Sequence, residues 1–424
     1  MLLGSGFCSL VYQVGWLREL RLVFGASTAA SAAVLAIFIG GLGVGSLVLG
    51  RRADAARNPL MFYGNLELVI ALSAAVSPLL LGLVRTLYIA SGGTPALGLV
   101  GGTAIRLVLA ALVLAVPTLA MGGTLAAATR AIESDDDARR RELAVLYGTN
   151  TVGAVIGAMV STFLLLEVFG TRRTILVAAL VNVLIALVAR SVGRRAGDVP
   201  RDAEDTPRDA AAGDAAGPRV PRPLVLVASG LVGFTFFLME MTWYRMLGPI
   251  LGGTVFTFGL ILAVALLGIG LGGLGYALRS AARPATVLGL ALTCLLEAIG
   301  LALPYALGDR VAFAASAARS ASVFGFAGQV GGWAMICVVV ILPAAIASGV
   351  QFPLLVNLVG RGRAHVGREL GVVYAANTAG AIAGALLGGF VLLPWLGALN
   401  CWRLAVVLLV VVAAAAFGAA VRAT

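Results

Sequence analysis

Twelve long apolar segments constrain the fold of this chain more than any other feature. A helix needs about 20 mostly apolar residues to cross the hydrocarbon core of a bilayer. The segments in the first part of the chain are 2–20, 27–49, 60–83, 103–127, 143–167 and 174–191. Those in the second part are 223–244, 254–278, 285–306, 328–350, 369–393 and 400–421. The sequence therefore predicts an all-α integral membrane protein with twelve transmembrane helices.

The composition also indicates a chain embedded in lipid. Hydrophobic residues make up 60% of the 424 positions and charged residues only 12%, whereas about 25% of a typical soluble domain is charged. All 30 basic residues are arginines, and they fall in short clusters between the apolar segments. Such clusters are a signal of membrane topology, so the expected partner is the lipid bilayer and not nucleic acid.

A polar stretch, residues 192–222, divides the chain. It contains six arginines, six acidic residues and four prolines, and we predict a disordered linker between six-helix repeats at 1–191 and 223–424. With the amino terminus inside, 20 of the 30 arginines fall on the inner loops, the linker and the carboxy-terminal tail. The positive-inside rule then places the linker and both termini in the cytoplasm. We expect a multi-pass protein of the inner membrane of a bacterium.

The two parts of the chain repeat each other at an offset of 227 residues. The repeated motifs are Gln13-x-x-Trp16-x-Arg18 with Glu240-x-x-Trp243-x-Arg245, Gly41-x-Gly43-x-Gly45 with Gly268-x-Gly270-x-Gly272, and Tyr147-x-x-Asn150-Thr151-x-Gly153-x-x-x-Gly157 with Tyr374-x-x-Asn377-Thr378-x-Gly380-x-x-x-Gly384. With small slips, Pro117 also pairs with Pro343, and Glu67 with Glu297. Because six helices is an even number, the second copy enters the membrane in the same orientation as the first. The prediction is therefore two parallel six-helix repeats in a major-facilitator-like arrangement.

The repeated glycines are interpreted as packing positions. Gly41-x-Gly43-x-Gly45 and its counterpart sit inside apolar helices, whereas a phosphate-binding loop follows a strand and opens a helix. Small residues spaced along a membrane helix allow two backbones to approach closely. We expect these glycines, together with Gly153 and Gly157 and their repeats, to mark the tightest contacts within each half.

No metal or cofactor site is expected. The only histidine is His365, and the cysteines stand singly in or beside apolar segments, at Cys8, Cys294, Cys337 and Cys401. A structural zinc site or a disulfide framework needs closely spaced ligands. The cysteines are therefore interpreted as small packing residues.

Three stretches resemble a known family. They are Gly6-Phe-Cys-Ser-Leu-Val-Tyr-Gln-Val-Gly-Trp-Leu-Arg18, the glycine-rich segment ending in Gly50-Arg-Arg-Ala-Asp54, and Leu146-Tyr-Gly-Thr-Asn-Thr-Val-Gly-Ala154 with its repeat at 373–381. They are similar to the membrane region of spermidine-synthase-like membrane proteins, the fused major-facilitator/spermidine synthase family. Fused members carry a soluble aminopropyltransferase-like domain after the helices. This sequence ends at Thr424 at the foot of its last helix, so we expect a stand-alone member or a fragment and assign no catalytic residue.

Three carboxylates within the apolar segments are candidate substrate-binding residues: Glu67, Glu297 and Glu240. An ionisable side chain inside a bilayer is costly and marks function by default. Because Glu67 and Glu297 are interpreted as repeat mates, we expect them to lie on opposite sides of the pseudo-axis, near the midplane where transporters bind substrate. Each could instead pair with an arginine or cap a helix, and Arg245 is close to Glu240 in sequence.

Aromatic and amide side chains complete the candidate site. Aromatic faces attract cations, and the candidates are Tyr12, Trp16, Trp243, Tyr147 and Tyr374. Asn150 and Asn377 could contact substrate, or could form hydrogen bonds between helices at the glycine contacts.

These observations predict a transporter-like membrane protein that handles a cationic amine such as a polyamine. One alternative is a membrane module that anchors or feeds an aminopropyltransferase encoded in the same chain or separately. Another is a structural subunit of a membrane complex. The Arg51-Arg52-x-Asp54 loop occupies the place of the gating loop between major-facilitator helices two and three, which suggests a gating role.

Overall fold

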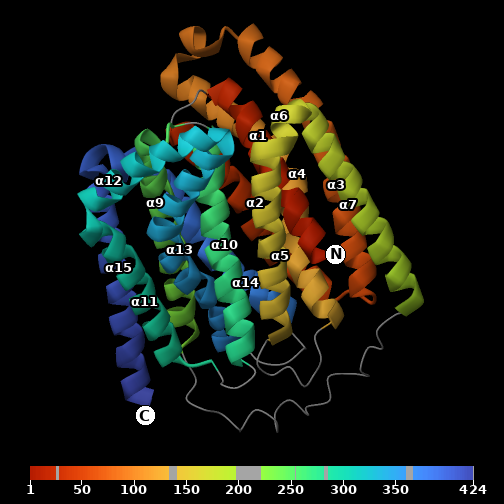
Figure 1. Cartoon of the computed structure of the whole chain (residues 1–424). Helices are drawn as coiled ribbons and strands as arrows, with labels where there is room; N and C mark the ends of the chain where they lie inside the picture. The colour runs from red at the N-terminus through yellow and green to blue at the C-terminus, as the bar shows by residue number, and fades with distance from the viewer. Residues whose placement is uncertain are drawn as a thin grey trace.

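Every regular element formed by the described residues is a helix (Figure 1). The computed structural model describes residues 1–24, 28–132, 141–196, 221–253, 255–280, 285–359 and 366–423. The first half contains α1 (Leu2–Phe24), α2 (Thr28–Asp54), α3 (Pro59–Ala90), α4 (Gly93–Ile132), α5 (Arg141–Val160), the π-helix η1 (Ser161–Leu165), α6 (Leu166–Val168) and α7 (Gly170–Ala196). The second half contains α9 (Arg222–Ile250), α10 (Val255–Ser280), α11 (Val287–Leu307), α12 (Asp309–Ala318), the 3-10 helix η2 (Arg319–Phe324), α13 (Gly325–Val359), α14 (Val366–Leu387), the π-helix η3 (Gly388–Leu392) and α15 (Leu393–Ala423).

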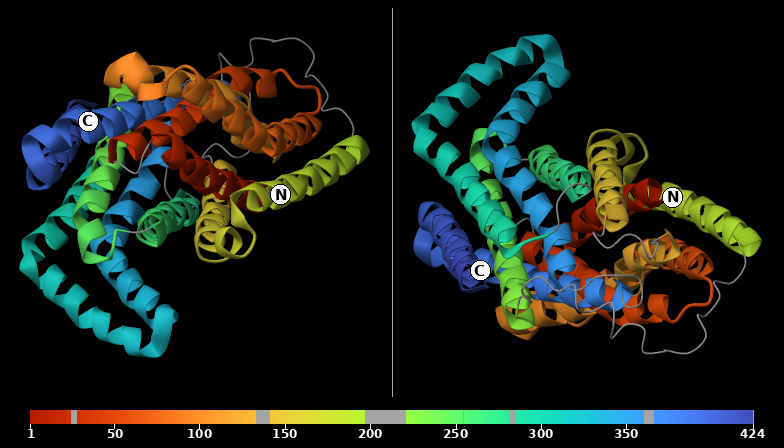
Figure 2. Two further views of the ribbon diagram at one scale, coloured as in Figure 1. Left: turned by 90° about the horizontal axis from the view of Figure 1, so that it is seen from above. Right: turned by 90° about the horizontal axis from the view of Figure 1, so that it is seen from below.

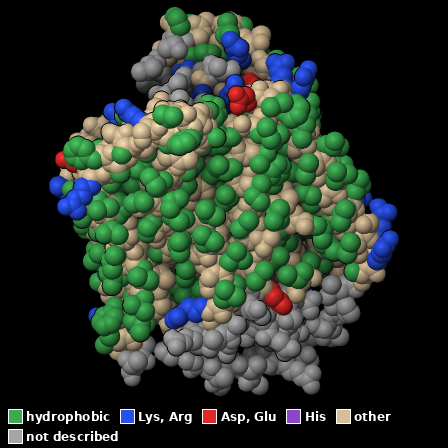
Figure 3. Space-filling view, in the orientation of Figure 1, with side chains coloured by type: hydrophobic (Ala, Val, Ile, Leu, Met, Phe, Trp, Pro, Cys, Tyr) green, Lys and Arg blue, Asp and Glu red, His purple; other side chains and the backbone are tan. Residues whose placement is uncertain are grey.

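The described helices cross the membrane twelve times. Ten helical stretches are long and apolar enough to span a bilayer. The last of them runs from Arg368 to Arg422 and bends at Gly397, whose φ is +75°, so it makes two crossings. Helix α1, which is 23 residues long, is not among these ten stretches, and it corresponds to the first of the twelve crossings predicted from the sequence. On the face shown in Figure 3, hydrophobic side chains form a broad band and charged groups lie toward the margins.

Local sequence signals position the starts of the third helix in each half. Pro59 follows Asn58, whose side chain accepts a hydrogen bond from the Met61 backbone N–H at 2.9 Å. Thr286 caps α11 in the same way through Gly289 at 3.0 Å. Such caps satisfy backbone donors that the first helical turn leaves without partners.

Several boundaries differ from the sequence prediction. Helix α7 continues to Ala196, into the stretch predicted as a linker, and residues 197–220 lie outside the described residues. Helix α12 and η2 were not predicted. They follow a break in the third helix of the second half at Gly308, where φ is +51°. In the first half the equivalent helix, α3, continues unbroken to Ala90.

The repeat extends to irregular backbone. The π-helices 161–165 and 388–392 are separated by 227 residues, and each inserts an extra residue per turn at the same place in its half. The positive-φ glycines Gly170 and Gly397 have the same separation. The repeat is therefore a structural duplication, and the halves lie side by side in the views along the bundle (Figure 2).

Glycines hold the first and fifth helices of each half together, as predicted. A Cβ atom on Gly153 would lie 1.9 Å from the Leu3 backbone oxygen on α1. A Cβ atom on Gly380 would lie 1.7 Å from the Gly230 backbone oxygen on α9. Only a residue without a side chain permits backbones to approach this closely.

The Gly-x-Gly-x-Gly motifs correct the prediction that all glycine contacts lie within a half. Gly41 and Gly45 face α4 of their own half, but a Cβ atom on Gly43 would lie 2.4 Å from the Thr378 side chain on α14. Residues i and i+4 share one face of a helix, whereas residue i+2 lies about 200° away. The motif therefore packs α2 between its own half and the other half, and Gly270 of α10 likewise faces Thr151 of α5.

Polar contacts join the halves at both ends of the bundle. We call the end where α7 stops and α9 starts the linker face. There the Asp54 carboxylate accepts a hydrogen bond from the Arg368 backbone N–H at 2.8 Å, which links α2 to the first turn of α14. At the opposite end, the Arg21 guanidinium donates to the Tyr244 hydroxyl at 3.4 Å.

Candidate functional site

A cavity of about 110 Å³ lies inside the bundle where four helices of the first half meet α14 of the second. Its lining residues are Gly6, Ser9, Leu10, Phe38, Leu42, Ser46, Met121, Gly122, Thr124, Leu125, Tyr147, Asn150 and Tyr374. Ser46 is eight residues from the linker-face end of α2, which is about 12 Å along the helix. The cavity therefore lies between the middle of the bundle and its linker face.

The volume of the cavity corresponds to about three or four water molecules. Ligand pockets in proteins are usually at least about 300 Å³, so the cavity is small in this conformation. The described lining includes hydroxyl, amide, aromatic and aliphatic side chains but no charged one. It is therefore a neutral, partly polar chamber.

Repeat mates Tyr147 and Tyr374 meet at this chamber. Both rings pack against Phe352 of α13, with ring centroids 4.9 Å and 5.5 Å away. Phe352 is itself the repeat mate of Leu125, which also lines the cavity. Two pairs of equivalent residues thus meet around the pseudo-twofold axis, and the sequence prediction had named the tyrosines of this group.

The predicted amide pair is used differently in the two halves. Asn150 lines the cavity, whereas the Asn377 side chain donates to the Ser229 backbone oxygen on α9 at 3.1 Å. The hydrogen bond between helices therefore occurs in the second half, and the substrate contact considered for Asn150 stays a prediction. The Thr151 hydroxyl donates to the Tyr147 backbone oxygen on its own helix at 2.8 Å.

Glu67 is fully buried inside the first half and does not line the cavity. The Asn182 amide on α7 donates a hydrogen bond to its Oε2 atom, and the Tyr12 hydroxyl donates to Asn182 Oδ1 at 3.2 Å. The hydroxyl groups of Ser5 and Tyr63 face the same carboxyl group. Predicted residues Glu67 and Tyr12 are thus brought together, but away from the cavity.

Glu297 is buried inside the second half, where the Gln351 amide on α13 donates to its Oε2 atom at 2.8 Å. Its pairing with Glu67 as a repeat mate is wrong. Seven buried positions of α3 recur in α11 at the 227-residue offset, and they pair Glu67 with Cys294 and Ile70 with Glu297. The carboxylates lie one helical turn apart in the repeat and contact different helices.

Glu240 on α9 is also buried, and its Oε1 atom has no hydrogen-bond partner among the described residues. Arg245 is exposed, so its position does not suit pairing with Glu240. Trp16 and Trp243 are buried outside the cavity. Trp16 donates to the Ser77 hydroxyl at 2.7 Å, whereas Trp243 packs edge-on against Phe236.

Sequence reasoning missed most of the polar lining. Ser9, Ser46 and Thr124 are ordinary residues in apolar helices, and no charge or motif distinguishes them. One signal was present: Ser46 and Thr124 lie beside the close approach of α2 and α4 at Gly45 and Gly122. Small polar residues next to such a contact are held near one another and can line a shared space.

Comparison with known proteins assigns the fold. No family model and no curated protein sequence matches the chain. Among solved structures, a bacterial homologue of the iron transporter ferroportin in an outward-facing state is similar over 100% of this chain and 98% of that one, with a TM-score of 0.58 and 12% identity. The proton:xylose symporter XylE, of the major facilitator superfamily, bound to 6-bromo-6-deoxy-D-glucose, is similar over 97% and 93%, with a TM-score of 0.59 and 14% identity.

These similarities, with the twelve crossings and the parallel repeat, define a polytopic membrane protein with a major-facilitator-like fold. At 12–14% identity they establish the fold alone.

Proposed function

We propose that this protein is a secondary transporter that carries a small cationic amine through the chamber around Tyr147 and Tyr374. The observation that supports this most is the position of the chamber, which is enclosed by the first half and completed by Tyr374 of the second. A chamber with walls from both halves changes its access when the halves rock against each other. The polar contacts at the two ends of the bundle are the contacts that such rocking would break in turn.

The lining supports an amine through aromatic faces and neutral acceptors. Tyr147, Tyr374 and Phe38 supply aromatic rings to the lining, and the face of such a ring attracts an ammonium group. The hydroxyl groups of Ser9 and Ser46 can accept its hydrogen bonds. No arginine of the described residues lines the chamber and repels a cation. Iron, which is named for the ferroportin-like neighbours, would find none of its usual carboxylate, imidazole or thiolate ligands in this lining.

Reconstituted liposomes test the proposal with radiolabelled putrescine. Uptake above that of empty liposomes is expected for the wild type. Tyr374→Ala removes a cation–π contact of about 0.5–2 kcal/mol and is expected to lower putrescine affinity about two- to thirtyfold. Tyr374→Phe keeps the ring and most of the affinity. Trp395→Ala, at a side chain that is 84% exposed, is the control. Absence of putrescine flux in the wild type would refute the amine assignment.

A neutral polar solute is a second candidate because the chamber has no carboxylate in its lining. Labelled xylose in the same liposomes separates the two. For a neutral solute the tyrosine hydroxyl matters more than the ring, so Tyr374→Phe would lower xylose uptake about as much as Tyr374→Ala.

A further inference from the structure

We infer that Glu67 is a proton-binding site, the place where a proton is held during the transport cycle. The inference rests on the proposed transport function and adds the coupling ion to it. Glu67 is enclosed by three helices of the first half: it stands on α3, contacts Asn182 on α7, and faces Ser5 on α1. None of its surface is exposed.

The hydrogen bonds around Glu67 leave one oxygen for the proton. Oε2 accepts from the Asn182 amide, whose own oxygen is occupied by the Tyr12 hydroxyl. Among the described residues, neither Oε1 nor the Tyr63 hydroxyl makes a hydrogen bond of full geometry, although the Ser5 and Tyr63 hydroxyls face the carboxyl group. A proton taken from water onto Oε1 makes the carboxyl group neutral and a donor, and the Ser5 and Tyr63 hydroxyls that face it can accept. Its release returns the proton to water and leaves the carboxylate held by Asn182.

The second half shows that the fold does not need this polar cluster. At the 227-residue offset, Ser5, Tyr12, Tyr63, Glu67 and Asn182 correspond to Val232, Met239, Leu290, Cys294 and Leu409. All five counterparts are buried hydrophobic residues. Cys294 also accepts a hydrogen bond from the Gln351 amide of α13 at 3.7 Å, and the same amide donates to Glu297 at 2.8 Å. The second half therefore holds its buried carboxyl group one helical turn away and against α13. The buried carboxyl group that meets α1 and α7 is therefore specific to the first half, and a buried ionisable side chain inside a membrane marks function by default.

The cluster favours a proton over a metal cation. Hard cations are held by several oxygen atoms, but the position beside Oε2 is filled by an N–H donor from Asn182. Among the described residues, the groups that face Glu67 include no second carboxylate. The titratable ones are Cys8 and Tyr12 on α1, Tyr63 on α3, and the amino group of Met1. On α7, the Arg190 guanidinium donates to Asn65. On α4, Arg130 lies in the last turn and Arg106, 13 residues from the start, donates to the Gly102 backbone oxygen.

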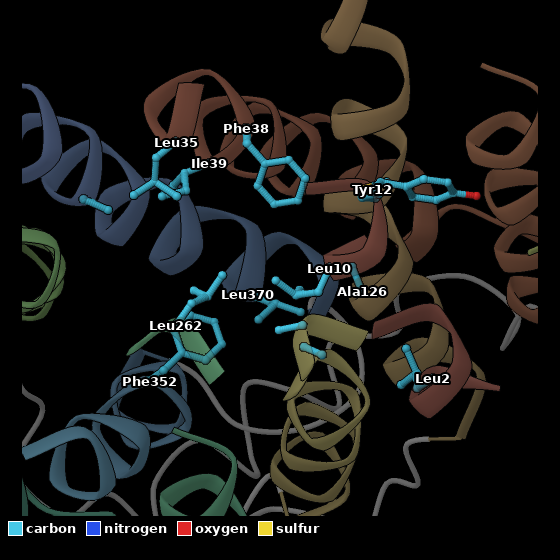
Figure 4. Close-up of a cluster of buried hydrophobic side chains, with 14 of the residues drawn as sticks. Leu2, Leu10, Tyr12, Leu35, Phe38, Ile39, Ala126, Leu262, Phe352 and Leu370 are labelled. Atoms are coloured by element: carbon cyan, nitrogen blue, oxygen red, sulfur yellow. The ribbon is translucent and has the colours of Figure 1, made fainter. Parts of the chain in front are cut away.

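Aromatic contacts connect the proton site to the chamber. The Tyr12 ring stacks on Trp16 with centroids 5.5 Å apart, and Trp16 contacts Phe38 of α2 at 6.3 Å. Phe38 lines the chamber. Figure 4 shows Tyr12 pointing away from Phe38 and Leu10, so the proton site and the chamber lie on different sides of α1. A change at Glu67 therefore reaches the chamber through Tyr12 and α1.

Reaction with dicyclohexylcarbodiimide tests the site without any substrate, because this reagent modifies protonated carboxyl groups in apolar surroundings. The purified full chain is treated over a range of pH, and modification of Glu67 is measured by peptide mass spectrometry. Modification that falls as the pH rises supports the inference. If Glu67 of the folded protein is not modified at any pH, or if sodium ions protect it, the inference is wrong.

Transport tests the coupling. In liposomes, putrescine accumulation driven by a pH gradient is compared with putrescine exchange in the absence of a gradient. The ratio of accumulation to exchange is expected to fall at least about tenfold in Glu67→Gln. Glu67→Cys, which places the residue found at the repeat position, is expected to fold and to show the same loss. Ser73→Ala on the same helix is the control.

The outcomes separate the two proposals. An unchanged ratio in Glu67→Gln, or accumulation driven by a sodium gradient in place of a pH gradient, would overturn the proton site while leaving the transporter in place. If the wild type moves no putrescine, the amine assignment fails, and the carbodiimide reaction still decides whether Glu67 binds a proton.

Discussion

Gly43 and Gly270 provide a matched test of the contacts between the halves. They are repeat mates, each the middle glycine of its motif, and each faces a threonine of the other half. A Cβ atom on Gly43 would lie 2.4 Å from Thr378 Cγ2 and 2.6 Å from Thr378 Cβ. A Cβ atom on Gly270 would lie 3.5 Å from Thr151, an ordinary van der Waals distance. Alanine at position 43 therefore clashes with α14, whereas alanine at position 270 fits against α5.

The expected difference in the free energy of unfolding between the two variants can be estimated from these contacts. Gly→Ala inside a helix gains about 1 kcal/mol of helix propensity, and this gain is common to both. Rotation of the Thr378 side chain does not move its Cβ atom, so the clash can be relieved only if α2 and α14 move apart by about 1 Å. Overpacking of this kind costs about 1–3 kcal/mol of stability. Gly43→Ala is therefore expected to be about 1–3 kcal/mol less stable than Gly270→Ala, on the order of 5 °C in Tm.

Thermal unfolding in detergent, followed by size-exclusion chromatography, measures both variants against the wild type. Thr378→Gly removes the clashing side chain, so the double variant with Gly43→Ala should recover at least about 1 kcal/mol relative to the sum of the single changes. If Gly43→Ala and Gly270→Ala have equal effects, or if the double variant shows no coupling, the assigned helix faces are wrong.

Three further predictions follow from particular contacts. Asp54→Asn replaces a charge-assisted bond to the Arg368 backbone with a neutral one, worth about 1 kcal/mol less; a cysteine introduced into the chamber should then react about five times faster with a water-soluble thiol reagent. Asn150→Ala should weaken substrate binding more than stability, and Asn377→Ala should do the reverse, as uptake and Tm would show. Ser77→Ala leaves a buried indole N–H without its acceptor and should cost about 1–3 kcal/mol of stability, measurable as a lower Tm.

The twelve crossings could be predicted because the hydropathy of each apolar segment indicates that it lies in lipid. A helix in lipid satisfies its backbone internally, so length and hydropathy suffice to identify it. The end of α11 at Leu307 agrees with the predicted end at 306, but the short helices α12 and η2 after Gly308 could not be predicted, because they are too short to be recognised by hydropathy. The 227-residue offset predicted the parallel arrangement of the two halves. Small shifts allowed in that alignment led to the wrong repeat mate for Glu67.

The candidate site was only partly predictable. Tyr147, Tyr374 and Asn150 were found because the repeat singled them out, and they do line the chamber. Ser9, Ser46 and Thr124 were missed because their importance comes from which helix faces meet. The three buried carboxylates were found by their chemistry, and the structure places them outside the chamber, so their role in substrate binding stays a prediction.

The amino-acid sequence by itself determined which segments lie in lipid, the order of the helices and their duplication. The first depends on hydropathy, and the other two on the sequence read along the chain. Only the tertiary structure decided which glycine faces which half, which residues line the chamber, and that Glu67 meets Asn182 on α7 while Cys294, at the repeat position, meets Gln351 on α13. The physical reason is that these properties belong to contacts between helices, and a helix of the same sequence can present any of its faces until its neighbours are in place.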